Sequence, residues 1–260
     1  MTSTAETISI NARGLEIPAQ LFSPNTDAVP APGLVVLHDI FGLDEWTQQA
    51  AARLAGFGYV TVAPDLYARG GAPPDASSEA ALYDFANSMH DSHLVNDALA
   101  ALDWLAARDD VDAARLALLG WGWGGAYALM AAGHDARIIT VADIAGAITY
   151  PVLTAKKTGS PLNFIADIEG TIFAAFPASD PLIPMNEIER LRGRLVEHDK
   201  RGEVKIYPDA PPRFWRDDAL PQTTALWRRL ENFLQTNLME PQESQEPLGD
   251  YPNEESRLHA

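Results

Sequence analysis

One uncharged stretch, from Leu116 to Gly133, constrains the fold more than any other part of the chain. It spans eighteen residues without a charged side chain, which is long enough for a membrane-spanning helix. It also contains five glycines, namely Gly120, Gly122, Gly124, Gly125 and Gly133. Glycine at this density interrupts a helix, so the stretch divides better into a buried strand, a tight turn and an alanine-rich helix. We therefore predict a soluble chain with no membrane partner.

The rest of the chain alternates between short apolar runs and longer segments with helical spacing. Gly33–His38 and Tyr59–Ala63 are continuous apolar runs, typical of strands covered on both faces. Other strands are expected at Arg115–Leu119, Ile138–Val141, Thr171–Phe176 and Val204–Tyr207, with an edge hairpin formed by Thr7–Ile10 and Leu15–Phe22. Helices are expected at Trp46–Phe57, Ser78–Met89, Leu94–Ala107, Pro184–Lys200 and Leu220–Leu238. The alternation predicts an α/β fold in one domain, residues 1–238, with a mostly parallel sheet of about eight strands and helices on both faces.

The composition limits what the chain binds and where it works. Its 36 acidic residues outnumber its 19 basic ones, giving a formal net charge of −17, so a nucleic-acid backbone would be repelled. Part of this charge lies in an acidic tail, residues 239–260, which holds six acids and one base. The absence of cysteine excludes a disulfide, a thiolate metal site and a cysteine nucleophile, and it suits a reducing cytoplasm. No signal peptide is visible, so a cytoplasmic location is expected.

The turn inside the uncharged stretch has the pattern of a catalytic motif. Gly120-Trp121-Gly122-Trp123-Gly124-Gly125 follows a strand and precedes a helix, which is the context of the nucleophile elbow G-x-Nuc-x-G. The residue at the nucleophile position is Gly122, which has no nucleophilic atom. Glycine at this point relieves the backbone strain that a residue with a Cβ would carry. The motif therefore predicts the fold of a hydrolase without its attacking group.

Three motifs in order resemble those of the dienelactone hydrolase family of α/β hydrolases. His38-Asp39-Ile40-Phe41-Gly42 is similar to the family's Q-E-I-F-G, and Ala63–Arg69 contains its P-D-L-Y-A-R. Gly120–Gly125 is similar to its G-Y-C-L-G-G. The resemblance runs from about Leu15 to Leu238 and implies the α/β-hydrolase fold, with a ligand cleft at the carboxyl ends of the strands.

The resemblance also implies a triad of Cys (Ser in other α/β hydrolases), Asp and His, and two of its members are missing. The acid falls on Asp180, within a match to G-x-x-D-x-x-V-P, whereas the nucleophile falls on Gly122 and the histidine on Pro212. Removing the nucleophile or the base of such a triad costs roughly 10⁶ in kcat. The oxyanion hole, by resemblance the amides of Trp123 and Ile40, is built from backbone and is expected to survive.

Three charged or titratable residues near the motifs are further candidates for catalysis or binding. His38 ends a buried strand and acts either as a general base or ligand-orienting group, or as a cap for its own loop. Asp39 takes the place of the family's glutamate, and Asp39 and Asp180 are candidates for a carboxylate pair. By resemblance Arg216 contacts a substrate carboxylate. The alternative for Arg216 is a surface ion pair with Asp217 or Asp218.

Aromatic residues around the elbow either line a ligand pocket or belong to the core. Trp121 and Trp123 flank Gly122, and Tyr67 belongs to the P-D-L-Y motif. The string His90-Asp91-x-His93 has no identified third ligand, so no metal is expected, and no cofactor is implied.

Three functions remain open at this stage. The first is a triad-deficient homologue, or pseudoenzyme, that binds a small carbonyl or carboxylate compound or acts on it without a covalent intermediate. The second is an active hydrolase of a small ester or lactone that uses His38, Asp39 or Asp180 to activate water. The third is a structural or interaction protein, such as a homo-oligomer that uses its acidic tail.

Overall fold

The fold is known from a computed structural model, which describes residues 5–25, 30–75 and 77–239. The strands are β1 (Ala5–Ala12), β2 (Leu15–Phe22), β3 (Ala31–Leu37), β4 (Val60–Pro64), β5 (Val111–Trp121), β6 (Ile138–Ile144), β7 (Thr171–Pro177) and β8 (Gly202–Tyr207). The helices are α1 (Glu45–Gly56), α2 (Glu79–Asn87), α3 (Asp91–Ala106), α4 (Trp123–Ala132), α5 (Met185–Glu197) and α6 (Pro221–Leu238), and 3₁₀ turns cover Pro161–Asp167 and Phe214–Arg216.

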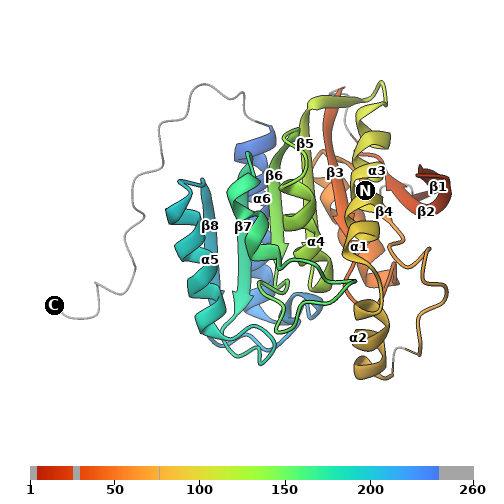
Figure 1. The fold of residues 1–260 in the computed structure, drawn as a ribbon. Helices are drawn as coiled ribbons and strands as arrows, with labels where there is room; N and C mark the ends of the chain where they lie inside the picture. The colour runs from red at the N-terminus through yellow and green to blue at the C-terminus, as the bar shows by residue number, and fades with distance from the viewer. Residues whose placement is uncertain (1–4, 26–29, 76, 240–260) are drawn as a thin grey trace.

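The eight strands form a single sheet in the order β1-β2-β4-β3-β5-β6-β7-β8 (Figure 1). The hairpin β1–β2 is antiparallel and joins the sheet through β4, whereas β4, β3, β5, β6, β7 and β8 run parallel. Helices α3 and α4 pack on one face of the sheet, and α1 and α6 pack on the other. This arrangement confirms the predicted α/β fold and explains why the central strands are apolar throughout: both of their faces are covered.

Most predicted elements are confirmed to within a few residues at their ends. The largest difference is β5, which starts at Val111 instead of Arg115 because its first residues pair with β3 across a register shift. The uncharged stretch divides as predicted, with β5 ending at Trp121 and α4 beginning at Trp123. No helix in the described part of the chain is long and apolar enough to cross a membrane. Apart from Met239, the acidic tail lies outside the described residues.

The loop after β6 is held against the helices by a buried ion pair. Lys157, with only 7% of its surface exposed, donates to the carboxylate of Asp91 at 2.8 Å and to the hydroxyl of Tyr127 at 2.5 Å. Asp91 is the first residue of α3, and its Oδ1 also accepts the Tyr127 hydroxyl at 2.8 Å. Burial lowers the pKa of Lys157, although Asp91 opposes the change. The ion pair thus joins this loop to α3 and α4.

Candidate functional site

The elbow is formed where β5 ends and α4 begins, with Gly122 between them. Its φ of +50° and ψ of −121° lie in a region that glycine tolerates and residues with a Cβ rarely adopt. The Gly122 amide donates to the carbonyl of Ile144 on the neighbouring strand β6 at 2.7 Å. The flanking Gly120 and Gly124 are required by close packing, because a Cβ at either position would overlap backbone atoms. The tight turn predicted from the motif is therefore present.

The carboxylate of Asp39 fills the space that a nucleophile side chain would occupy. A Cβ built on Gly122 would have Oδ1, Cγ and Oδ2 of Asp39 all within 2.8 Å. Asp39 Oδ1 accepts the backbone amide of Trp123 at 2.9 Å, and this amide is one of the two donors that the resemblance assigns to the oxyanion hole. Asp39 has only 2% of its surface exposed. The loss of the side chain at position 122 is thus matched by a carboxylate that reaches in from the loop after β3.

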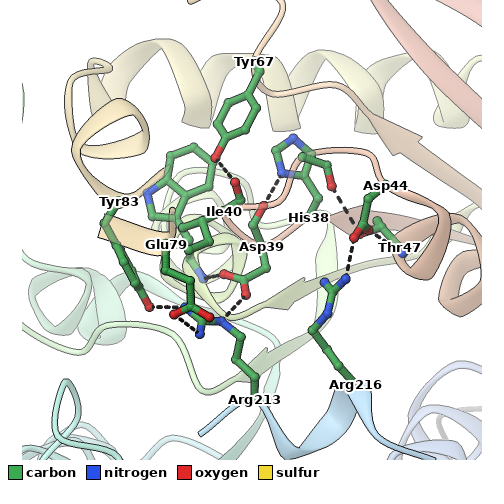
Figure 2. A network of polar contacts seen from close by, with 12 residues as sticks. His38, Asp39, Ile40, Asp44, Thr47, Tyr67, Glu79, Tyr83, Arg213 and Arg216 are labelled. Atoms are coloured by element: carbon green, nitrogen blue, oxygen red, sulfur yellow. Dashed lines mark hydrogen bonds and ion pairs between the residues drawn. The ribbon is translucent and has the colours of Figure 1, made fainter. Parts of the chain in front are cut away.

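Arg213 balances this buried carboxylate, and the sequence analysis missed it (Figure 2). Its Nε donates to Asp39 Oδ2 at 3.1 Å, its Nη1 to Glu79 at 2.8 Å and its Nη2 to the Tyr83 hydroxyl at 2.7 Å. Burial works against its charge, but Asp39, Tyr83 and Glu79 together raise the pKa of Arg213 above its ordinary value. Arg213 has a left-handed φ of +56°. Its position directly after Pro212, where the family's histidine is expected, is the signal that sequence inspection could have used.

His38 is bonded at both ring nitrogens to backbone. Its Nε2 accepts the amide of Leu66 at 3.0 Å, so the proton lies on Nδ1, which donates to the carbonyl of Asp39 at 2.7 Å. The side chain is fully buried. This geometry favours the structural alternative, in which His38 orients the loop that carries Asp39, over the predicted role as a general base. Tyr67 acts on the same loop, because its hydroxyl donates to the carbonyl of Ile40 at 2.7 Å.

Arg216 pairs with Asp44, which corrects the predicted ion pair with Asp217 or Asp218 (Figure 2). Its guanidinium also lies 4.6 Å from the ring centre of Phe41 and 4.8 Å from that of Trp46. Asp44 is the N-cap of α1 and accepts the amide of Thr47 at 2.9 Å. Arg216 therefore contacts the start of α1. Binding of a substrate carboxylate by Arg216 stays a prediction.

Asp180 stands at the position that the resemblance assigns to the acid of the triad. Asp180 is buried, with 8% exposed, and its Oδ1 accepts the amide of Leu182 at 2.9 Å. Asp39 Oδ2 is bonded to Arg213 and Asp180 Oδ1 to its own loop, and the carboxylate pair of Asp39 and Asp180 stays a prediction. Both lie near Tyr83: burial is the main reason that the pKa of Tyr83 rises to about 12, and the two carboxylates add to it.

The two tryptophans that flank Gly122 have different environments. Trp121 is fully buried and packs against Trp46 and Trp227, with ring centres 5.0 and 5.2 Å away. It belongs to the core, which corrects its prediction as a substrate-binding residue. Trp123 is partly exposed and lies 4.8 Å from the ring of Tyr127.

Asp143, a fully buried carboxyl group below the elbow, is expected to make stability depend on pH. Burial raises its pKa from 3.8 to about 7, and its one bond is from the amide of Gly146 at 2.6 Å. The folded state keeps a proton that the unfolded state releases above pH 4, so this contribution to stability is lost as the pH rises towards 7. Asp143→Asn removes the titration and keeps the acceptor. The free energy of unfolding of the variant minus that of wild type should therefore be about 3 kcal/mol larger at pH 8 than at pH 5. Urea denaturation at the two pH values measures this difference. An unchanged difference between the two pH values would contradict it.

A cavity of about 500 Å³ lies away from the elbow, between the β1–β2 hairpin and α3. Its lining includes Asn11, Arg13, Trp104 and Arg137. None of the predicted site residues lines it, so the elbow remains the candidate site.

Comparison with known proteins identifies the family of the chain. Residues 17–238 match the Dienelactone hydrolase family. The chain belongs to the dienelactone hydrolase family. An Escherichia coli K12 protein named "Putative carboxymethylenebutenolidase" is 30% identical over 214 residues, which cover 80% of this chain and 77% of that protein. A Bradyrhizobium protein named "Probable 2-oxo-3-(5-oxofuran-2-ylidene)propanoate lactonase" is 29% identical over 183 residues, covering 70% and 73%.

Solved structures of dienelactone hydrolase type confirm the fold. A crystal structure titled "Putative Dienelactone Hydrolase" from Klebsiella pneumoniae superposes with a TM-score of 0.83 at 26% identity, covering 90% of this chain and 99% of that one. This member of the dienelactone hydrolase family thus has the family fold along nearly its whole length, with Gly122 and Pro212 at the positions that the motif assigns to the nucleophile and the histidine.

Proposed function

We propose that this dienelactone hydrolase homologue binds a small carbonyl or carboxylate compound at the elbow without forming an acyl-enzyme. It is then a pseudoenzyme for the nucleophile–histidine–aspartate route. The observation that carries the proposal is the carboxylate of Asp39, which fills the place of the nucleophile side chain beside Gly122. An acyl-enzyme needs an attacking atom there and a base to take its proton, and glycine and proline provide neither.

Two groups at the elbow support binding of a carbonyl or carboxylate oxygen. The Trp123 amide points at a carboxylate oxygen, that of Asp39, at 2.9 Å. The Arg213 guanidinium lies beside the second oxygen of the same carboxylate at 3.1 Å. An amide and a guanidinium are the donors that carboxylate recognition uses.

Direct activation of water by Asp39, His38 or Asp180 is the second candidate. The position of Asp39 supports this candidate, because its carboxylate lies next to the Trp123 amide that the resemblance assigns to the oxyanion hole. Its burial and its bonds to Trp123 and Arg213 count against it, since a general base must meet the water whose proton it takes. His38 has no ring nitrogen left to accept a proton from water. We therefore place the binding function first.

Incubation of the wild-type protein with p-nitrophenyl acetate should show no burst of p-nitrophenol. Mass spectrometry should find no acetyl group on the peptide that contains residues 116–133, because this segment offers no oxygen or sulfur atom at position 122. A burst or an adduct at this segment would overturn the proposal. Steady turnover without an adduct, lost in Asp39→Ala, would establish the water-activating alternative instead. His38→Ala and Asp180→Ala serve as companion variants, since they remove the other two predicted bases.

A further inference from the structure

The charges around Arg213 restrict how a ligand carboxylate can enter the site. Arg213 already faces two carboxylates, Asp39 on its buried side and Glu79 on its exposed side (Figure 2). A third carboxylate next to the same guanidinium would add repulsion between like charges in a partly buried setting. A ligand carboxylate is therefore better accommodated by replacing one of the two than by joining them.

Asp39 is the carboxylate that a ligand would replace. Glu79 touches only the outer nitrogen Nη1 of Arg213, and its side chain is 57% exposed. Asp39 contacts both the Trp123 amide and the guanidinium, and each contact is one that the carboxylate of a free acid makes equally well. After such an exchange, the Trp123 amide and the Arg213 guanidinium each still have a carboxylate partner.

We propose that Asp39 is an internal occupant of a carboxylate-binding site formed by the Trp123 amide and Arg213, and that a small monocarboxylate binds by displacing it. This inference rests on the proposed function, because both place the ligand at the elbow. A group tethered to the chain competes at an effective concentration of about millimolar or higher. The wild-type protein should therefore bind a free carboxylate weakly, and removal of the occupant should strengthen binding.

Acetate is the probe, because it has the same carbon and oxygen atoms as the aspartate side chain that Asp39→Gly removes. In this variant the dissociation constant for acetate should be at least about tenfold lower than in wild type, since the tethered competitor is gone. An NMR titration that follows the Trp123 backbone amide measures it, with chloride at equal ionic strength as the reference. Addition of Arg213→Gln to Asp39→Gly should cancel the gain.

Glu79→Gln provides the matched control. It removes a carboxylate from the exposed side of the same guanidinium without emptying the space beside Gly122, so its gain in acetate affinity should be smaller than the roughly tenfold gain of Asp39→Gly. The inference is wrong if Asp39→Gly binds acetate no better than wild type, or if Glu79→Gln gains as much.

Asp39→Asn covers the case in which Asp39→Gly does not fold. Here a neutral amide replaces the charged occupant, and acetate should again bind more tightly than in wild type. An unchanged dissociation constant would overturn the inference. These results are distinct from failure of the proposed function, which would be seen as an acetyl adduct on the wild-type chain.

Discussion

A cysteine placed at position 122 should react slowly with iodoacetamide while Asp39 is present, and at least about tenfold faster once Asp39 is replaced by glycine. In Gly122→Cys the new side chain meets the Asp39 carboxyl group, whose negative charge raises the pKa of the thiol. In Gly122→Cys/Asp39→Gly the thiol sits at the start of α4 beside the freed Trp123 amide, which favours the reactive thiolate. The wild-type chain has no cysteine, so alkylation reports this site alone.

The rate of alkylation as a function of pH, read by mass spectrometry, measures both reactivity and the pKa of the thiol. Ser88→Cys on the exposed end of α2, with and without Asp39→Gly, is the control and should react at one rate in both backgrounds. Position 122 has a left-handed φ, so a residue with a Cβ costs about 1–3 kcal/mol there, and circular dichroism must show that each variant is folded. Equal alkylation rates with and without Asp39 would show that the carboxylate does not occupy the nucleophile's place.

Replacement of Lys157 by alanine should lower the free energy of unfolding by about 4 kcal/mol, because it leaves the Asp91 carboxylate buried without its cation. The Oδ2 atom of Asp91 is already buried without a hydrogen-bond partner, so the remaining charge has little else to compensate it. Urea denaturation at neutral pH measures the loss. The double variant Lys157→Ala/Asp91→Ala should recover part of it, since the unpaired charge is then gone.

Lys156→Ala is the matched control for this experiment. Lys156 is exposed, and its amine bonds to the carbonyl of Ser88 at 2.5 Å. Its replacement should change the stability by less than about 0.5 kcal/mol. If Lys157→Ala lowers the free energy of unfolding by no more than Lys156→Ala does, the buried pair does not hold the loop after β6.

Much of the fold follows from local patterns. The apolar runs of the central strands, the helical spacing between them and the glycines around position 122 predict the sheet and the elbow, because they express backbone geometry and burial directly. Motif spacing also pointed to Asp39, which the structure has beside Gly122, whereas the roles of Asp180 and Pro212 stay predictions. The start of β5 was missed because its pairing with β3 begins before the apolar run.

The partners of the charged side chains could not be read from the sequence. Arg216 is next to Asp217 in the chain but pairs with Asp44, the N-cap of α1. Trp121 and Trp123 are two residues apart, yet the turn at Gly122 sends the first into the core and leaves the second at the surface of the site.

The sequence by itself predicted an α/β sheet and determined that a glycine stands at the elbow, because these properties depend on which residues occur and how they are spaced. Its resemblance to the dienelactone hydrolase family implied the fold of that family. Only the tertiary structure decided that Asp39 fills the vacated place and that Arg213 neutralises it. These two residues are 174 positions apart, and no local rule joins them. They meet because the loop after β3 and the turn after β8 lie at the same edge of the parallel sheet, where a buried carboxylate requires a cation.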